Sequence, residues 1–256
     1  MTRALLALAA LVVALFLAGC GNDDDEGAGT TDTVTTVDPG GTTDVRVYWL
    51  RDGKVWPALR EIEDTEEVAR AALEELLAAP TADEEAELQL TTAIPEGTTL
   101  EVVAIEDRVA EVELSNELPE EPLAQVVYTV TQFPTVDSVT IQGRSYARDD
   151  FETLTPAILV ESPLSFEEVG NPVRATGTAN TFEANFQYEL TDTDGRIVDE
   201  SFVTATSGSG ERGTFDFTTS EYEIPFDGVG ALIVFELSAE DGSRINLVEI
   251  PVRMSR

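Results

Sequence analysis

The chain has 256 residues, of which 50 are acidic, 15 are basic, one is cysteine and none is histidine. Without histidine there is no Ser–His–Asp triad, Cys–His dyad or imidazole metal ligand, and one cysteine makes neither an internal disulfide nor a thiolate metal cage. A formal charge of −35 repels phosphate backbones and anionic lipid head groups, so we expect no nucleic-acid partner. With 42% hydrophobic residues, the chain is able to bury one large core or two smaller ones.

The first twenty residues are typical of an export signal. Arg3 precedes an uncharged apolar run over residues 4–17, which is too short to span a bilayer as a helix. The run ends in Leu17-Ala18-Gly19-Cys20, which resembles the lipobox of bacterial lipoproteins. That resemblance implies that a signal peptide, residues 1–19, is removed and that Cys20 carries the lipid that attaches the protein to the cell membrane. An export signal without lipidation is the alternative, and in both cases the rest of the chain is expected to be extracytoplasmic.

Residues 20–43 have the composition of a flexible tether. Glycine, threonine and aspartate dominate this segment, and Val34 and Val37 are its only larger apolar residues. Such a segment cannot bury enough apolar surface to offset the entropy lost on ordering. We therefore expect a disordered acidic linker that holds the folded part away from the membrane.

The pattern over residues 44–152 predicts a domain of mixed helices and strands. A strand over residues 45–50 stops at the hairpin signal Asp52-Gly53, and a helix follows that Asp64 and Glu67 are expected to cap and Pro80 to end. Two alternating segments, 100–106 and 109–114, predict a second hairpin, and a last strand is expected over residues 139–142. The order of these elements predicts an α+β sheet layered by two helices.

The segment 123–133 is ambiguous on its residues alone. Val126, Val127, Val130 and Phe133 recur at helical spacing, and Pro122 suits the first turn of a helix, but the valine, tyrosine and threonine content is typical of a strand.

Several motifs of residues 44–152 resemble a GerMN domain, a module named after a sporulation and spore germination protein. The resemblance covers about 100 residues, and it implies that 123–133 is helical and that the domain is non-catalytic and associated with envelope assemblies, in some cases rings. The segments that carry it are Val45–Leu50, Glu74–Pro80, Thr92–Thr98, Glu111–Leu114 and Tyr128–Pro134, with Val136 and Val139.

Residues 153–256 change to period-two alternation, as in a half-buried strand. Phe182, Ala184, Phe186, Tyr188 and Leu190 alternate with polar residues. With the neighbouring turn signals, about seven strands and no helix are expected, which predicts an all-β immunoglobulin-like sandwich. The expected strands are 158–161, 173–179, 182–190, 197–205, 214–218, 231–238 and 244–252.

This second region is also similar to a known family, the immunoglobulin-like domain found on bacterial spore germination proteins. In that family the domain often follows a GerMN domain, so the order of the two modules behind a lipobox strengthens both resemblances. The segments that carry it are Glu161–Pro163, Asn171–Val173, Gly177–Ala184, Asp192–Gly195 and Ser238–Gly242.

The remaining catalytic candidates are carboxylates and one lysine. The clusters Asp83-Glu84-Glu85 and Glu120-Glu121 are expected in turns on the solvated surface, where nothing indicates the raised pKa that a glycosidase acid needs. Lys54, the single lysine, directly follows a hairpin glycine and is a poor candidate for Ser–Lys catalysis. We therefore predict no catalytic residue and no enzyme.

Two further motifs have binding interpretations that compete with structural ones. Asp192-Thr193-Asp194-Gly195 resembles the start of a calcium loop, but the expected glutamate position is Val203, so a hairpin turn is favoured and no metal site is predicted. Trp49 and Trp56 flank a hairpin and could stack on sugars, although core or sheet-edge positions are favoured.

The sequence as a whole predicts a lipid-anchored, non-enzymatic envelope protein without a cofactor. Its two modules are expected to bind or assemble with other envelope proteins, and a homo-oligomer is left open. The alternative is a lipoprotein that binds the cell wall or another carbohydrate.

Overall fold

The computed structural model describes residues 40–256, so the predicted signal peptide, Cys20 and nearly all of the predicted tether lie outside the described residues. The described residues belong to one compact unit. Within residues 40–256, no helix is long and apolar enough to cross a membrane. The N-terminal region begins at Thr42, because β1 includes the last two residues of the predicted tether, and it runs to residue 152. The C-terminal region comprises residues 153–256.

The N-terminal region begins with a long antiparallel hairpin of β1 (Thr42–Arg51) and β2 (Lys54–Glu63). The strands turn at Asp52-Gly53, where both residues have positive φ, 52° and 71°. A two-residue turn of this kind needs left-handed backbone at both positions, which glycine and aspartate tolerate. The predicted hairpin turn is therefore confirmed.

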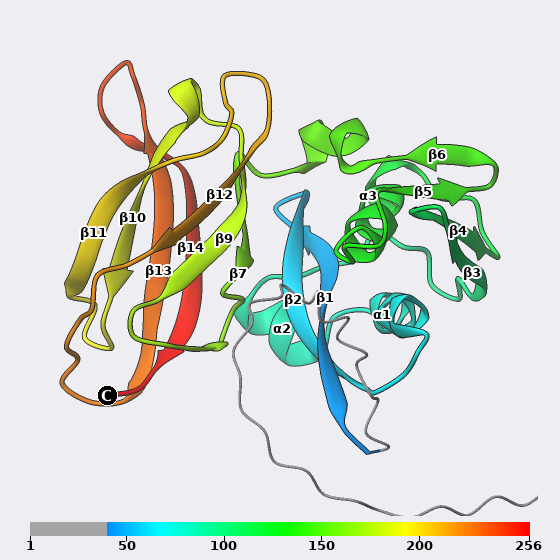
Figure 1. Ribbon diagram of the computed structural model, residues 1–256, viewed down its shortest axis with the longest axis horizontal. Coiled ribbons are helices and arrows are strands. Elements are labelled where there is room, and N and C mark those ends of the chain that lie inside the picture. Colours follow the sequence, from blue (N-terminus) through cyan, green and yellow to red (C-terminus); the bar gives the residue numbers. More distant parts are fainter. Residues whose placement is uncertain (1–39) are drawn as a thin grey trace, which may run out of the picture. The chain divides into compact units, whose positions relative to one another are not determined.

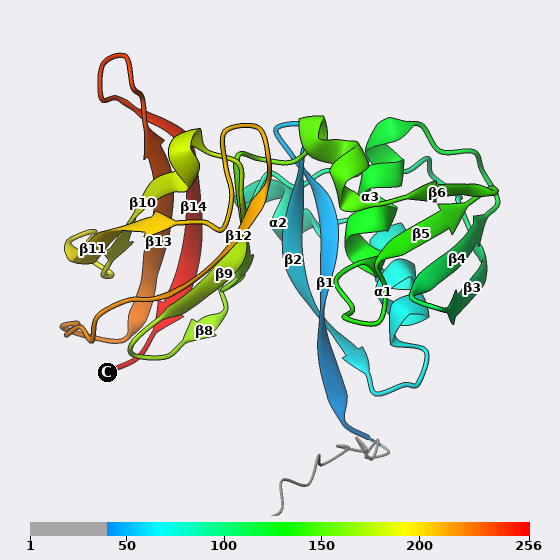
Figure 2. The ribbon, with the colours of Figure 1, turned by 45° about the horizontal axis from the view of Figure 1, so that its top comes forward.

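Helices α1 (Val68–Leu77) and α3 (Glu120–Val130) lie between this hairpin and a second sheet (Figure 2). The implied helix is confirmed, but it runs from Glu120 to Val130 and ends before Phe133, whereas residues 123–133 were expected; Pro122 is buried in its first turn. A short third helix, α2 (Ala82–Glu87), was not predicted.

The second sheet has four strands in the order β3-β4-β5-β6. The predicted hairpin of β3 (Leu100–Glu106) and β4 (Val109–Leu114) is confirmed, and β5 (Ser138–Ile141) pairs parallel to β4. A short strand, β6 (Arg144–Tyr146), completes the sheet at the far edge from β3.

Two expectations for this region are wrong in detail. The strands form two sheets rather than one, because side chains of the α3 segment occupy the free edge of β1. The Gln132 side chain accepts a hydrogen bond from the backbone N–H of Arg46 at 2.7 Å, and the Thr129 hydroxyl accepts one from the N–H of Tyr48 at 3.1 Å. Here amide and hydroxyl groups satisfy donors that a neighbouring strand would otherwise take.

The second wrong detail is the cap of α1, which Asp64 does not form. The helix starts only at Val68, its N-cap residue is Glu67, and no side chain caps it. Asp64 instead closes the hairpin: its N–H donates to the carbonyl of Gly41 at 3.1 Å, and its carboxylate accepts a hydrogen bond from the Thr43 hydroxyl. The long hairpin therefore competes with the helix for the same aspartate.

A 3₁₀ segment, η1 (Arg148–Leu154), leads from the N-terminal region into a sandwich of two sheets (Figure 1). One sheet has the order β11-β10-β13-β14-β8 and the other β12-β9-β7. All seven predicted strands are present, and the two-residue β8 is the only additional strand among residues 153–256. The strands are β7 (Ile158–Ser162), β8 (Glu168–Val169), β9 (Arg174–Ala179), β10 (Asn185–Thr191), β11 (Ile197–Thr204), β12 (Gly213–Thr218), β13 (Gly228–Leu237) and β14 (Arg244–Met254).

The predicted fold class, an α+β GerMN-like domain followed by an all-β sandwich, is confirmed. The start of one strand differs from the expectation. A single 3₁₀ turn, η2 (Phe182–Ala184), precedes β10, and Glu183 and Ala184 in it have positive φ. The alternation therefore begins at Asn185: Phe186, Tyr188 and Leu190 are buried, whereas the Phe182 side chain is exposed.

Candidate interaction surface

Cys20, the one residue to which the sequence assigns a covalent role, lies outside the described residues. The described residues contain no group of three or more histidine, cysteine, aspartate or glutamate side chains that could hold a metal ion.

The acidic cluster Asp83-Glu84-Glu85 was expected in a surface turn between elements, but it lies in a helix, at the N-terminal end of α2. Thr81 and Glu84 form a capping box there, and the Glu84 carboxylate makes a two-pronged ion pair with Arg60, with contacts of 2.6 and 2.5 Å. Burial raises the pKa of Glu84, but hydrogen bonds from Arg60 and Thr81 lower it by more, so its pKa is below the usual value. A carboxylate held ionised in this way is suited to capping the start of a helix and not to donating a proton.

The other acidic candidates are structural too. Glu120 and Glu121 are exposed in the first turn of α3, where negative charge stabilises the helix start. Asp192 closes the turn between β10 and β11, where its carboxylate accepts hydrogen bonds from the backbone N–H groups of Asp194 and Arg196, both at 2.9 Å. The predicted hairpin turn is therefore confirmed at this position.

Both tryptophans are core residues, as the sequence favoured. Trp49 is fully buried and Trp56 is 6% exposed. Their ring faces are also occupied, because the Arg60 guanidinium lies 4.4 Å from the centre of Trp49 and that of Arg51 lies 4.5 Å from Trp56. Neither ring is available as a stacking platform for a sugar.

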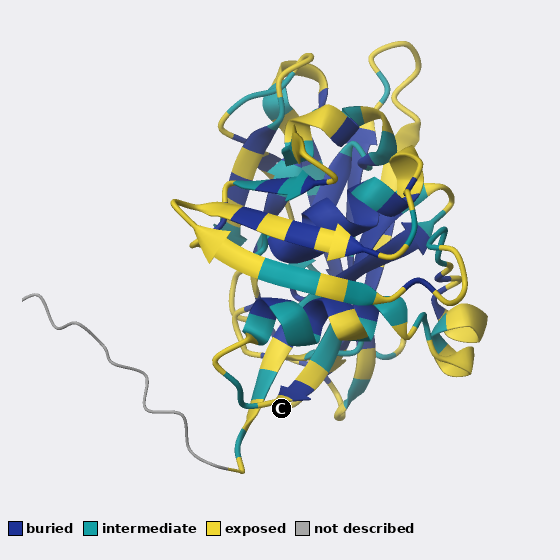
Figure 3. Cartoon of the chain, turned by 90° about the vertical axis from the view of Figure 1, so that its right-hand side faces the viewer, coloured by how far each residue is buried: buried dark blue, intermediate teal, exposed yellow. Residues whose placement is uncertain are grey.

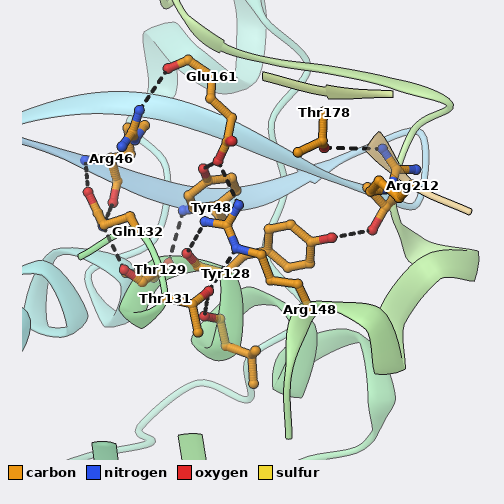
Figure 4. Close-up of polar contacts among 12 residues, drawn as sticks. Arg46, Tyr48, Tyr128, Thr129, Thr131, Gln132, Arg148, Glu161, Thr178 and Arg212 are labelled. Carbon is orange, nitrogen blue, oxygen red and sulfur yellow. Dashed lines mark hydrogen bonds and ion pairs between the residues drawn. The ribbon is translucent and has the colours of Figure 1, made fainter. Parts of the chain in front are cut away.

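A buried polar network joins the two regions of the chain (Figure 4). Arg148, at the start of η1, donates a hydrogen bond to the carboxylate of Glu161 in β7 at 2.8 Å and another to the Thr131 hydroxyl at 2.8 Å. The Tyr48 hydroxyl donates to the same carboxylate, and the Arg46 guanidinium donates to the Glu161 carbonyl at 3.1 Å. Glu161 therefore accepts from residues of the β1 strand and of η1 at once.

The electrostatics of this network fix its charges. Burial raises the pKa of Glu161, but the nearby Arg148 charge and the hydrogen bonds from Tyr48 and Arg148 outweigh it, so the pKa lies below its usual value. Burial and the adjacent Glu161 charge raise the pKa of the Tyr48 phenol. Tyr48 thus stays a neutral donor and Glu161 a charged acceptor at neutral pH.

A second contact lies beside the first and is also built on an arginine. Arg212, from the loop before β12, donates to both oxygens of the Glu152 carboxylate at 2.8 and 2.9 Å and to the carbonyl of Pro156 at 2.9 Å. Asn180 donates to Glu152 as well, at 2.8 Å. Two-pronged ion pairs of this kind are stronger than single neutral hydrogen bonds, although the Glu152 side chain is 40% exposed. The two networks therefore hold the regions together as one body.

An apolar surface lies at one end of the five-stranded sheet of the sandwich. Phe182 is 60% exposed, Phe202 is 73% exposed and Leu237 is 43% exposed. They line a shallow hollow of about 220 Å³, to which polar residues of the η2 turn and of β10 and β13 also contribute. We call these three side chains the Phe202 surface. Ile245 and Leu247 of β14 are also exposed on this sheet. Large apolar side chains gathered in this way on a soluble fold mark binding sites more often than isolated ones do.

The Phe202 surface is rigidly supported. Phe202 on β11 lies opposite Gln187 of β10, and Gln187 lies opposite Phe235 on β13. The side chains of Phe202, Gln187 and Phe235 therefore share one face of the sheet. The turn that carries Phe182 is fixed by the buried Glu236, whose carboxylate accepts hydrogen bonds from the Phe182 N–H and from Asn246, each at 2.8 Å. Rigid support lowers the ordering entropy that a binding surface loses on association.

Neither feature was found from the sequence. Arg148, Glu161 and Arg212 find their partners only through the packing of distant segments, and no local signal marks them. The alternation wrongly places Phe182 on the buried face with Phe186. For Phe202 it does give a signal, because Phe202 is next to Val203 and therefore lies on the opposite face of the strand.

Comparison with known proteins matches both regions to families. Residues 46–144 match the Germane family, described as sporulation and spore germination. Residues 157–243 match the immunoglobulin-like domain of bacterial spore germination. A search of the curated proteins finds no match.

Three solved structures are similar to parts of the chain. The tandem GerMN domains of the sporulation protein GerM from Bacillus subtilis are 23% identical over 45% of this chain and 42% of that chain, with a TM-score of 0.34. The first GerMN domain of the same protein is 24% identical over 41% of this chain and 86% of that chain, with a TM-score of 0.31. A predicted lipoprotein from Clostridium perfringens is 17% identical over 47% of this chain and 98% of that chain, with a TM-score of 0.29.

The match thus spans less than half the length of the tandem GerM structure. The two family matches confirm both resemblances noted in the sequence and their order along the chain. The chain therefore carries a GerMN domain of the sporulation and spore germination family, followed by an immunoglobulin-like domain of bacterial spore germination.

Proposed function

We propose that this protein is a lipid-anchored, non-enzymatic protein of the cell envelope that binds other envelope proteins. The observation that carries the proposal is the Phe202 surface. It exposes two phenylalanines and a leucine on a rigid sheet, in a chain whose formal charge of −35 otherwise favours a solvated surface. Aromatic side chains of this kind supply much of the binding energy at protein interfaces.

The chemistry of the carboxylates supports a role without catalysis. Among the described residues, every aspartate or glutamate with a displaced pKa has it displaced downward, because arginine, hydroxyl or backbone donors face the charge. A general acid that works near neutral pH needs the opposite displacement. The single lysine, Lys54, donates a hydrogen bond to the carbonyl of Thr153 and so helps to join the two regions.

The anchor is proposed from the sequence. The segment Leu17-Ala18-Gly19-Cys20 has the pattern of a lipobox, and the acidic segment between Cys20 and the start of β1 at Thr42 is long enough to hold the folded part away from the membrane. A lipid on Cys20 would keep the binding unit in the envelope, where its partners are.

Chemical crosslinking on intact cells, followed by purification of the full chain, tests the proposal. We expect the same envelope protein to be recovered in repeated experiments with wild type and to be lost with Phe202→Ser. Repeated recovery of the chain alone would reject a binding role. A Cys20→Ser variant tests the anchor separately, because it should move the protein from the membrane fraction to the soluble fraction without unfolding it.

A further inference from the structure

A second apolar opening lies in the N-terminal region, between α1 and the edge strand β3. It is a groove of about 490 Å³ whose apolar lining includes Val103 and Ile105 of β3, Val68 of α1 and Phe133. We call it the β3 groove. Figure 3 shows β3 largely exposed beside α1, at the edge of the sheet.

Ile105 is on the side of the sheet that should be buried. In the β3–β4 register it lies opposite Ala110, and Val103 lies opposite Val112. Ala110 and Val112 are fully buried under the helices, whereas Ile105 on the same face is 43% exposed. The core face of the sheet is thus left open where β3 extends beyond α1.

The backbone N–H and C=O groups of Val103 and Ile105 are also available for pairing with another strand. Asp107 and Arg108 form the hairpin turn with positive φ, 47° and 66°. In such a two-residue hairpin the flanking pair, Glu106 and Val109, exchanges hydrogen bonds, and bonded pairs alternate along the ladder. The N–H and C=O groups of Val103 and Ile105 therefore point away from β4, and no other strand pairs with β3 among residues 40–256.

The rim of the groove is acidic. Glu66 and Glu67 are exposed at the start of α1, and Glu66 has no ion-pair partner among the described residues. Arg70 is the one cation among the described residues that line the groove, and it is already shared between Glu67 at 3.2 Å and Glu74 at 3.9 Å. The rim therefore attracts a positively charged ligand.

We infer that the β3 groove binds an extended segment of a partner protein that adds a strand to β3, places apolar side chains into the groove and presents an arginine or lysine to Glu66 and Glu67. Addition of the partner's strand to the edge of the sheet supplies backbone hydrogen bonds, which give affinity. The groove accommodates every second side chain of that strand, which gives specificity. A second copy of the chain is a poor occupant of the groove because its charge of −35 is repelled by the acidic rim. The chain's own residues 21–39 are excluded for the same reason, since they contain acidic residues and no basic one.

This inference adds a second surface to the proposed function and rests on it only for the presence of envelope partners. The probe is a synthetic peptide of about nine residues in which valine and threonine alternate and arginine stands at both ends. Its counterpart carries glutamate in place of both arginines. Fluorescence anisotropy with the full chain in detergent micelles measures both affinities.

We expect the arginine peptide to bind about 10-fold more tightly than the glutamate peptide, and the difference to shrink in about 0.5 M salt. Ile105→Lys should lower the affinity for the arginine peptide by about 10-fold or more, since it places a positive charge in the groove. Val109→Lys is the matched control: Val109 is 37% exposed on the same hairpin but lines the opposite face of the sheet, and the change in charge is identical. It should leave the affinity within about 2-fold.

Amide hydrogen exchange distinguishes strand addition from simple filling of the groove. The bound peptide should protect the N–H groups of Val103 and Ile105 and leave that of Ala104, which is bonded to β4, unchanged. Equal affinity for both peptides, equal loss in the two lysine variants, or no protection at Val103 and Ile105 would overturn the inference. If neither peptide binds, but a crosslinked partner is recovered with wild type and lost with Phe202→Ser, the inference fails while the proposed function stands.

Discussion

The guanidinium of Arg148 and the carboxylate of Glu161 form an ion pair at 2.8 Å, and only 23% and 15% of these side chains are exposed. Arg148 precedes the C-terminal region and Glu161 lies in its first strand, while Tyr48 and Tyr128, whose rings lie within 5.5 Å of the guanidinium, belong to the N-terminal region. The junction between the two regions is therefore a packed contact that contains a charged pair, and not a flexible linker.

Removing one partner of this pair should be costly. Glu161→Gln or Arg148→Met leaves an uncompensated buried group, and we expect a loss of about 3–5 kcal/mol in the free energy of unfolding. The exposed pair Arg174–Asp216 is the control, and Asp216→Asn should cost much less than either change at the junction, because solvent screens an exposed pair. Urea unfolding of the full chain measures both. Equal costs for the two variants would show that the junction contributes little.

The same pair should make stability depend on pH in one direction. The pKa of Glu161 is lowered in the folded protein, so its stabilisation is complete above the ordinary glutamate value of 4.5 and is lost as the pH falls through the lowered value. The difference in unfolding free energy between wild type and Glu161→Gln should therefore be largest near neutral pH and shrink below pH 4.5. A difference that grows on acidification would contradict this assignment of charge.

The tryptophans should not report on sugars. Because Trp49 and Trp56 are buried and arginines cover their rings, native fluorescence should be shifted to the blue and quenched only weakly by acrylamide. Titration with cell-wall fragments should leave the emission unchanged. A shift on titration would restore the carbohydrate-binding alternative.

Truncation to alanine should change the free energy of unfolding very differently at two phenylalanines of the same sheet. Phe202 is 73% exposed, so Phe202→Ala should change the free energy of unfolding by about 0.5 kcal/mol or less. Phe186 is 2% exposed, so Phe186→Ala should cost about 3–5 kcal/mol. Thermal unfolding checks both. A large cost at Phe202 would assign that side chain to folding rather than to binding.

The predictable part of the fold is the part that local patterns determine. The turns at Asp52-Gly53 and Asp107-Arg108 need left-handed backbone, and alternation on either side of them fixes the strands, so both hairpins were predicted. Helix α2 was missed, although Thr81 and Glu84 form the capping-box pattern that would have indicated it. The acidity of that segment instead suggested a solvated turn.

What could not be predicted depends on contacts between distant segments. Asp64 has the right residue type and spacing to cap α1, but the hairpin end formed with Gly41 and Thr43 takes it first. The buried positions of Arg148 and Glu161 depend on how β7 packs beside β1, which no local pattern records. The exposure of Phe182 likewise depends on one 3₁₀ turn that interrupts an otherwise regular alternation.

The central claim is that the Phe202 surface binds a protein partner, and photocrosslinking at single positions in the full chain on intact cells tests it most directly. A photoreactive amino acid replaces Phe202 or, as a control, Val229, which is 47% exposed on β13, about 20 Å along the strands from the Phe202 row. We predict a discrete adduct of one size from position 202 and none from position 229. No adduct from position 202, or the same adducts from both positions, would contradict the account.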